Sequence, residues 1–334
     1  MTLNASTDST ALNSTARSAQ SPTRHLPSAQ GNTSVRSYLA AALADNTLLA
    51  YRSDLKHFIA WGGVIPAAPE SVANYLAGYA TILSCATLSR RVVAIGRAHT
   101  AQGLLSPAHS ELVTATLQGI RRIRGRPPRQ VAPLLMNDVV QLVRGLTGLR
   151  GLRDKALLLI GFAGALRRSE LVSLDVDDVQ FVAEGALIRL RRSKTDQEGR
   201  GRVIAIPCTG GRDCPPCALR AWLHATHIVS GALFRGVNQY GQLLQQRLSA
   251  QSVALVIKGR AAAAGLDAAR YSGHSLRAGF ATNAAKAGAS AISIRAQTGH
   301  KSDAMLQRYI RDGDLFRNNP NLKIWPSAAR KCKS

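Results

Sequence analysis

The chain has 334 residues, 46% of them hydrophobic, which is enough for two globular domains and excludes a wholly disordered protein. Lys and Arg number 43 against 19 Asp and Glu, and the net charge of +24 favours nucleic acid over an anionic membrane surface as the partner. No apolar run reaches the ~20 residues of a transmembrane helix, and residues 1–10 lack a secretory signal pattern, so we expect a cytoplasmic protein.

The first part of the chain predicts a disordered tail followed by a helical domain. Residues 1–33 are rich in Ser, Thr, Asn and Gln and contain scarcely any large apolar side chain. Residues 34–126 contain four apolar stripes at helical spacing, with capping candidates at 45–47 and Gly62-Gly63 as a helix end. The stripes are Leu48, Tyr51, Leu55, Phe58 and Ile59; Val72, Tyr75, Leu76 and Tyr79; Leu88, Val92 and Ile95; and Val113, Leu117 and Ile120. We predict a small four-helix bundle.

An arginine-rich linker follows this bundle. It contains Arg121, Arg122, Arg124, Arg126 and Arg129, and the pair Pro127-Pro128 indicates a domain boundary. The arginines are either a solvated linker or, beside a DNA channel, ligands for phosphates.

Residues 127–320 predict a second domain that mixes helices with a small β-sheet. Helices are expected over 136–146 and 154–164, with a helix end and turn over 170–178. Residues 186–192 and 202–206 predict a β-hairpin around Lys194, and residues 218–311 are mainly helical with glycine breaks. Residues 321–334 form a C-terminal tail. The fold class is therefore mainly α with a small β-sheet, in two domains.

The cysteines do not indicate an extracellular disulfide framework. There are five, an odd number, and Cys85 and Cys332 lie far from the rest. Cys208, Cys214 and Cys217, with His224 and His227 downstream, contain a Cys-x-x-Cys zinc half-site, although Pro215-Pro216 stiffens the loop and a second cysteine pair is missing. Zinc ligands and small buried thiols both remain open for these residues.

Several charged residues stand at positions where they need a partner or a ligand. Arg167 lies between two apolar segments, and Glu170, three residues on, shares its helical face. His274 and Arg277 are likewise three residues apart on one predicted helix. His300 follows Gly299 in a turn, and Tyr309 stands on the next helix. Taken singly, each pattern is common in proteins without such a site.

Taken in order, the patterns resemble the tyrosine recombinase (phage integrase) family. They are Gly-x-x-Arg-x-Ser-Glu-Leu at 164–171, the hairpin Lys194, His-x-x-Arg at 274–277, Gly-His at 299–300 and Tyr309. The resemblance covers roughly residues 35 to 315, and its specific motifs are confined to 164–309. The helical region at 34–126 resembles the core-binding (SAM-like) DNA-binding domain of the family, and 127–320 its α+β catalytic domain.

The resemblance implies a DNA transesterification that uses no metal and no cofactor. Tyr309 would attack the scissile phosphorus and leave a 3′-phosphotyrosine. Arg167 and Arg277 would hold the nonbridging oxygens, His274 would act as base, and Lys194, with Lys258 and Lys301 as rivals, would protonate the leaving 5′-oxygen. His300 would contact the phosphate, and Glu170 would orient Arg167.

The resemblance also implies partners and leaves rival functions. We expect double-stranded DNA with a specific core site, a homotetramer in the synaptic complex, and integration, excision or resolution, as in mobile genetic elements. The alternatives are strand relaxation of the type IB topoisomerase kind and a DNA-binding protein of the same fold without catalytic activity. The apolar residues at 315–325 dock either on a neighbouring subunit or on the chain's own surface.

Overall fold

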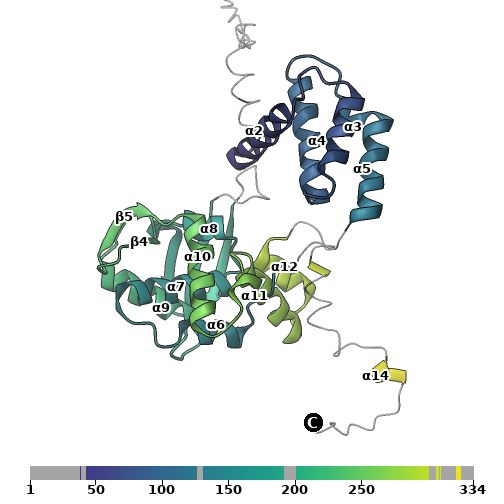
Figure 1. The fold of residues 1–334 in the computed structure, drawn as a ribbon. Helices are drawn as coiled ribbons and strands as arrows, with labels where there is room; N and C mark the ends of the chain where they lie inside the picture. The colour runs from purple at the N-terminus through teal and green to yellow at the C-terminus, as the bar shows by residue number, and fades with distance from the viewer. Residues whose placement is uncertain are drawn as a thin grey trace, which may run out of the picture. The chain divides into compact units, whose positions relative to one another are not determined.

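A computed structural model describes residues 43–125, 131–191 and 201–300, together with Tyr38, Leu306, Gln307, Tyr309 and residues 321–324. The chain forms two compact units, Met1–Pro128 and Arg129–Ser334 (Figure 1). In the described ranges, no helix is both long enough and apolar enough to cross a membrane. The expected tail at 1–33 and Lys194 lie outside the described residues.

The first unit is helical, and Figure 1 shows α3, α4 and α5 side by side. Its elements are α2 (Asp45–Ala60), α3 (Pro69–Gly78), α4 (Cys85–Thr100), the short 3-10 helix η1 (Pro107–His109) and α5 (Glu111–Arg124). Ser84 and Ser110 cap α4 and α5, because their side chains accept hydrogen bonds from the N–H groups of Thr87 and Val113.

The core of the first unit comes from the predicted apolar stripes. Phe58, Tyr75, Leu88 and Val113 are all fully buried and belong to one cluster.

Two details of the prediction for α2 are wrong. Ile59 is 54% exposed, because the apolar stripe of α2 is narrower than its sequence suggests. The N-cap of α2 is Ala44, which offers no side-chain hydrogen bond, so the expected caps at 45–47 do not begin the helix.

The second unit contains all the described elements that follow α5. Its helices are α6 (Met136–Val143), α7 (Gly148–Ala163), α8 (Arg168–Ser173), α9 (Pro215–Thr226), α10 (Ala250–Ala263), α11 (Ser275–Lys286), α12 (Ala291–Thr298) and α14 (Asn321–Ile324), with the 3-10 helices η2 (Val176–Asp178) and η3 (Ala268–Arg270). Its strands are β1 (Val179–Val182), β2 (Gly185–Leu190), β3 (Arg202–Pro207), β4 (Arg235–Val237) and β5 (Leu243–Arg247).

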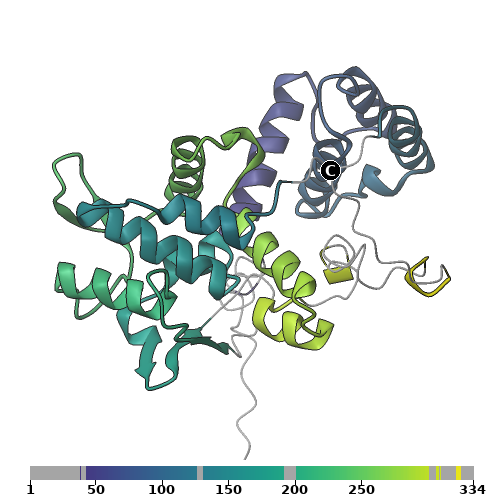
Figure 2. The same cartoon turned by 90° about the horizontal axis from the view of Figure 1, so that it is seen from below.

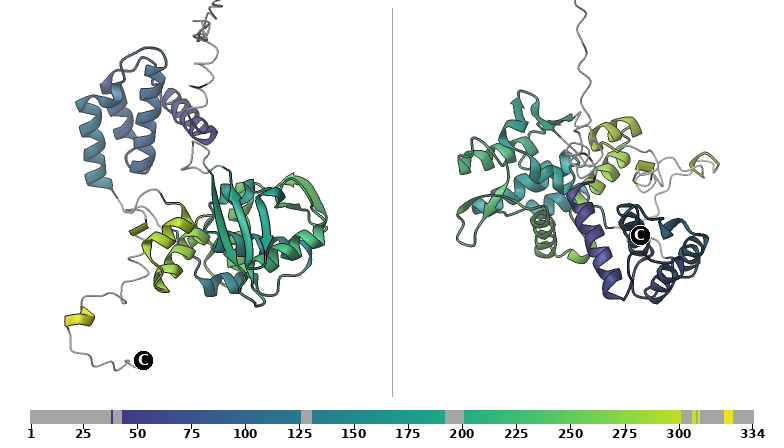
Figure 3. Two further views of the ribbon diagram at one scale, coloured as in Figure 1. Left: turned by 180° about the vertical axis from the view of Figure 1, so that it is seen from behind. Right: turned by 90° about the horizontal axis from the view of Figure 1, so that it is seen from above.

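The larger sheet has the order β1-β2-β3, with all neighbours antiparallel (Figure 3, left). The predicted hairpin is confirmed, because β2 pairs with β3 and Ile188 lies opposite Ile204. Strand β1 and the separate β4-β5 ribbon were not predicted. Both are short and carry glycines or polar residues, so their alternation is weak.

The core of the second unit lies between the sheet and the helices. Leu157, Leu158 and Ile160 of α7 are fully buried in one cluster with Ile204 of β3. Helix α7 begins at Gly148, earlier than the predicted residue 154, because packing outweighs the low helix propensity of its glycines. Helix α6 ends at Val143 rather than 146, since Gly145 adopts a positive φ of 68°.

Helices α11 and α12 lie next to each other in two views (Figures 1 and 2). The backbone of α11 closely approaches the segment that precedes α6. The N–H of Leu134 donates to the carbonyl of Ser275 at 3.0 Å, and a Cβ added at Gly279 would lie 1.7 Å from the Leu134 oxygen. Gly279 is therefore required for this contact, which positions the helix that carries Arg277.

Substituting Gly279 tests this close approach. Gly279→Ala should lower the free energy of unfolding by about 1–3 kcal/mol, because the segment at Leu134 must move. Scanning calorimetry on the full chain measures the change. Gly259→Ala is the matched control, since Gly259 lies in α10 with no neighbouring atom within 4 Å of its Cβ position, and it should stabilise the helix by up to about 1 kcal/mol. Equal effects of the two substitutions would contradict the packing argument.

Candidate active site

A tight turn between α7 and α8 presents Arg167. Ala165, in this turn, adopts a positive φ of 48°. Arg167 is the N-cap of α8, and its backbone N–H donates to Glu170 Oε2 at 2.9 Å. Its guanidinium forms an ion pair with the other oxygen of Glu170, which is buried. Arg167 and Glu170 therefore form the pair that the sequence predicted, and the Glu170 carboxylate binds both the backbone and the side chain of Arg167.

Arg277 is the most deeply buried cation of this region. It is 1% exposed, and its Nη1 donates to the carbonyl of Ala165 at 2.8 Å. In the part of the chain that the structure describes, its Nε and Nη2 have no hydrogen-bond partner. Burial, followed by the charge of Arg167, lowers the pKa of Arg277 to about 10. A buried guanidinium with two unsatisfied donors is costly, and an oxyanion would satisfy both.

His274 lies at the start of α11 and contacts Tyr309. Its Nε2 is 2.9 Å from the Tyr309 hydroxyl oxygen, within hydrogen-bond distance. The residue is exposed, yet neighbouring protein atoms partly desolvate its ring. This desolvation, together with Arg277 and Arg167, lowers the pKa of His274. The neutral ring that results can accept a proton from the phenol.

Tyr309 is held against the α11-α12 pair. Its ring packs on a small apolar cluster that includes Ala281, Ala285, Ile294 and Leu306. The cluster is supplied by both helices and by the segment that carries Tyr309 itself. The position of the tyrosine therefore depends on the same helices that carry His274 and precede His300.

His300 follows the end of α12. Gly299 ends that helix with a φ of 64°, and His300 Nδ1 lies 2.8 Å from the Thr298 hydroxyl. The imidazole is 6% exposed, and its centroid is 5.9 Å from that of the Tyr309 ring. Burial, then Arg277 and Arg167, lower the pKa of His300 to about 4. The ring is therefore neutral near pH 7.

Arg202 belongs to the same cluster and was not predicted. It begins β3, and its Nη1 donates to the carbonyls of Ala296 at 3.2 Å and Gln297 at 2.8 Å, at the end of α12. Its Nη2 is 3.9 Å from Glu170 Oε2. The alternation of side chains along β3 could have predicted this residue, because Arg202 lies on the same face as the buried Ile204 and Ile206. A cation on the inward face of a strand requires a partner.

The structure thus brings most of the predicted site residues together. Arg167, Arg277, Arg202 and the two histidines influence one another electrostatically, and Tyr309 lies among them. Glu170 is the carboxylate paired with this cluster. A cluster of three guanidinium groups, one carboxylate, two imidazoles and a phenol suits a phosphodiester and a tyrosine nucleophile.

The remaining predicted residues fall elsewhere. Lys194, Arg126 and Arg129 lie outside the described residues. Arg121, Arg122 and Arg124 occupy the last turn of α5, where all three are exposed. Arg121 donates to the Ser89 hydroxyl at 2.9 Å. These arginines belong to the first unit, and their predicted contact with phosphates stays a prediction.

Comparisons with known proteins agree with this geometry. The phage integrase family model matches residues 134–314, more than half of the chain. An "integrase/recombinase xerD homolog" of Selenomonas ruminantium is 42% identical over 293 residues, covering 84% of this chain and 86% of the relative. The tyrosine recombinase XerD of Mycobacterium tuberculosis strain H37Rv is 29% identical over 294 residues, covering 80% of this chain and 87% of that protein.

A solved structure shares the fold. Lambda integrase (residues 75–356), as a dimer bound to a COC′ core site, superposes with a TM-score of 0.56 at 20% identity, covering 90% of this chain and 98% of that one. The site and fold define a tyrosine recombinase. The chain belongs to the phage integrase family. The fold class, family and enzyme class predicted from the sequence are confirmed.

The low pKa of His300 predicts a pH-dependent stability. The unfolded chain protonates this residue below the ordinary value of 6.5, whereas the folded chain does so only near pH 4. The unfolded state therefore holds more protons in this window, and stability falls as the pH falls through it. Replacing His300 with Gln should reduce the loss of unfolding free energy between pH 7 and 5 by about 1–2 kcal/mol.

Urea unfolding of the parent chain and of His300→Gln at both pH values measures this difference. The comparison between the two chains isolates His300, because all other histidines are common to both. An unchanged loss of stability in the variant would show that folding does not lower the pKa of His300, which contradicts the prediction.

Proposed function

We propose that this recombinase cleaves and rejoins DNA at a specific core site through a 3′-phosphotyrosine, with Tyr309 as the nucleophile. The observation that carries the proposal is the position of the Tyr309 hydroxyl, 2.9 Å from His274 Nε2 and within the electrostatic influence of the buried Arg277. The hydroxyl thus has a proton acceptor in contact with it and a cationic group for an oxyanion in the same cluster.

Cleavage begins with proton transfer from the Tyr309 hydroxyl. A free tyrosine has a pKa of about 10, so at neutral pH the phenol needs a base. The neutral His274 accepts the proton, and the surrounding guanidinium groups favour the phenolate that forms. The phenolate oxygen bonds to the scissile phosphorus, and the bond from phosphorus to the 5′-oxygen breaks. Lys194, from sequence resemblance, supplies the proton that the departing 5′-oxygen requires.

The transition state adds negative charge to the nonbridging oxygens. Arg277 Nε and Nη2, which have no hydrogen-bond partner among the described residues, can donate to these oxygens. Arg167, which Glu170 holds in place, supplies a second guanidinium. Both groups are held before DNA binds, so little reorganisation accompanies the reaction. His300, whose ring centroid lies 5.9 Å from that of Tyr309, is the residue that the family resemblance assigns to contact with the phosphate. The residues therefore carry out the chemistry without requiring a metal ion or cofactor.

Strand exchange follows because the phosphotyrosine conserves the energy of the broken bond. A 5′-hydroxyl from a second duplex reverses the first step and joins the strands. Lambda integrase has been solved as a tetramer bound to a Holliday junction, with a TM-score of 0.55 to this chain. By analogy, we propose that this chain binds double-stranded DNA and acts as a homotetramer on two duplexes. Integration, excision and resolution, as in mobile genetic elements, are all compatible with this chemistry.

We propose that the first unit also binds DNA. Residues 34–126 would form the core-binding domain and 127–320 the catalytic domain, with a tail at 321–334. The exposed Arg121, Arg122 and Arg124 at the end of α5 provide fixed charges for DNA phosphates. A cytoplasmic location fits a chain whose substrate is DNA.

A nicked suicide substrate tests the nucleophile directly. Nicked duplexes from the DNA flanking the gene should trap a covalent complex, because the short strand diffuses away after cleavage. Tyr309→Phe should abolish this adduct, and His274→Ala should slow its formation by about 10²–10⁴-fold, the usual contribution of a general base. Denaturing gels measure the adduct, and mass spectrometry locates the modified residue.

The control is Tyr240→Phe, which makes the same change on an exposed turn between β4 and β5. It should cleave like the parent chain. An adduct that persists in Tyr309→Phe would refute the assignment. Joining of strands between two duplexes, rather than relaxation of supercoils alone, separates a recombinase from type IB topoisomerase activity.

A further inference from the structure

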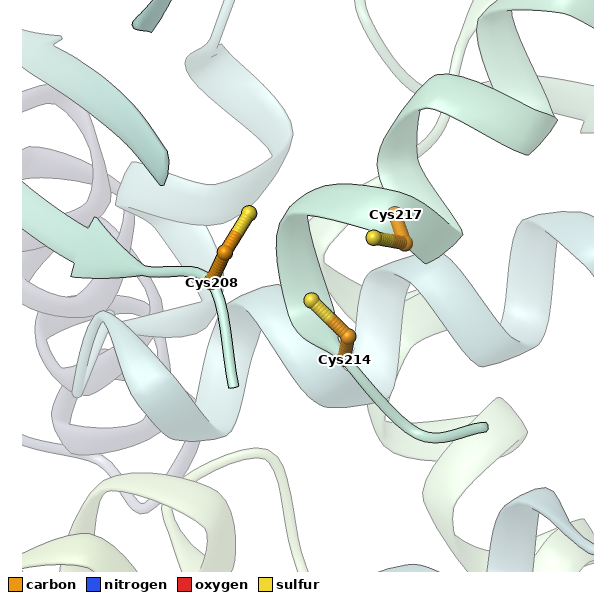
Figure 4. A group of neighbouring side chains, drawn as sticks. All are labelled: Cys208, Cys214 and Cys217. Atoms are coloured by element: carbon orange, nitrogen blue, oxygen red, sulfur yellow. The ribbon is translucent and has the colours of Figure 1, made fainter. Parts of the chain in front are cut away.

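Three thiols outside the catalytic pocket converge at the junction of the sheet and α9. Cys208 follows the end of β3, Cys214 is the N-cap of α9, and Cys217 lies in the first turn of that helix. Figure 4 shows the three side chains gathered around a common space. Their sulfur atoms all lie within 4.8 Å of one another. The catalytic steps use none of them.

The proline pair between two of these cysteines supports the arrangement. From the sequence alone, the stiffness that Pro215 and Pro216 give the loop is evidence against a metal site. In the structure they occupy the first positions of α9, where a missing N–H costs nothing and the proline φ suits the helix. Cys214 also accepts hydrogen bonds from the backbone N–H groups of Cys217 and Thr209. The stiff turn therefore holds two sulfurs on one side of the helix start.

The loop that joins Cys208 to Cys214 is anchored at both ends. The N–H of Cys208 donates to the Glu184 carbonyl at 2.7 Å. Lys155 of α7 forms an ion pair with Asp213 at 2.9 Å and donates to the Arg212 carbonyl at the same distance. These contacts fix the loop before any ligand binds, so that binding costs little conformational entropy of the loop.

We propose that Cys208, Cys214 and Cys217 bind one zinc ion through three thiolates. At a Zn–S distance of about 2.3 Å, sulfur atoms in a tetrahedral site are separated by about 3.8 Å, so a contraction of about 1 Å or less from the observed limit completes the geometry. Cys208 and Cys217 are exposed, which leaves the fourth position open to water. Thiolate ligands select soft or borderline cations such as zinc over magnesium or calcium.

The histidines considered from the sequence do not belong to this site. His224 lies in the last turn of α9 and His227 just beyond it, at the opposite end from Cys214. A helix of twelve residues is about 18 Å long. Among the described residues, the cluster of metal-ligating side chains contains only the three cysteines.

A structural role follows from where the ion would bind. It would join the end of β3 to the start of α9, and the opposite end of β3 carries Arg202. Cys208 lies six positions after Arg202 along the strand, a span of about 20 Å. Zinc would thus stabilise the sheet that supports the active site without touching the phosphate.

Cobalt titration of the full chain tests this site. The reduced protein, freed of metal by a chelator, should bind one Co²⁺ per chain with a sulfur-to-cobalt charge-transfer band, and Zn²⁺ should displace it. Zn²⁺ should also raise the melting temperature, since it binds only the folded arrangement. Cys217→Ser, at an exposed position, should abolish the band while the apo-protein remains folded.

Cys85→Ser is the matched control, because Cys85 lies in the first unit, and it should bind cobalt like the parent chain. Absence of the charge-transfer band in the parent chain overturns the proposal. So does an unchanged band in Cys217→Ser. A further experiment uses mass spectrometry on protein that is kept without reductant in saturating Zn²⁺. Formation of a Cys214–Cys217 disulfide under these conditions would contradict a bound ion.

Discussion

The interaction on which the site depends is the burial of Arg277 with two donors left for an incoming anion. Only one of its guanidinium nitrogens is used within the described protein, in the bond to the Ala165 carbonyl. Burial lowers the pKa of both histidines, the charges of Arg277 and Arg167 lower it further, and Arg202 adds to this effect at His300. Glu170 balances part of this charge and fixes Arg167. The fold therefore holds several like charges close together, and a bound phosphodiester would reduce their mutual repulsion.

Much of the fold followed from apolar periodicity, because helix and strand faces must be buried. The stripes of α3, α4 and α5 and the β2-β3 hairpin were predicted for this reason. The errors came where tertiary packing overrides local pattern. Helix α7 continues back to Gly148 because it is buried on nearly all sides, and the stripe of α2 narrows at Ile59. Short strands such as β1 and β4 offered too few residues for alternation to be recognised.

The site was predicted through an ordered set of motifs rather than through any one residue. Arg167 with Glu170, and His274 with Arg277, are local pairs that helical spacing reveals. Their convergence with Tyr309 over more than a hundred residues required the family resemblance, since no local rule reports it. Arg202 was not predicted, because its partners come from elements that are distant in the sequence. They are the carbonyls of Ala296 and Gln297 and the carboxylate of Glu170. Likewise, sequence alone left the three-cysteine cluster undecided, because only the fold brings Cys208 to the start of α9.

In the proposed mechanism, Arg277 neutralises charge on the scissile phosphate. A methylphosphonate at that position replaces one charged oxygen with a methyl group and removes the charge itself. On the natural phosphate, Arg277→Ala should slow cleavage by about 10²–10³-fold, as the loss of an oxyanion donor does elsewhere. On the methylphosphonate, the same substitution should cost less than about 10-fold, because there is no charge left to stabilise. Equal losses on the two substrates would contradict the account and reduce Arg277 to a structural residue.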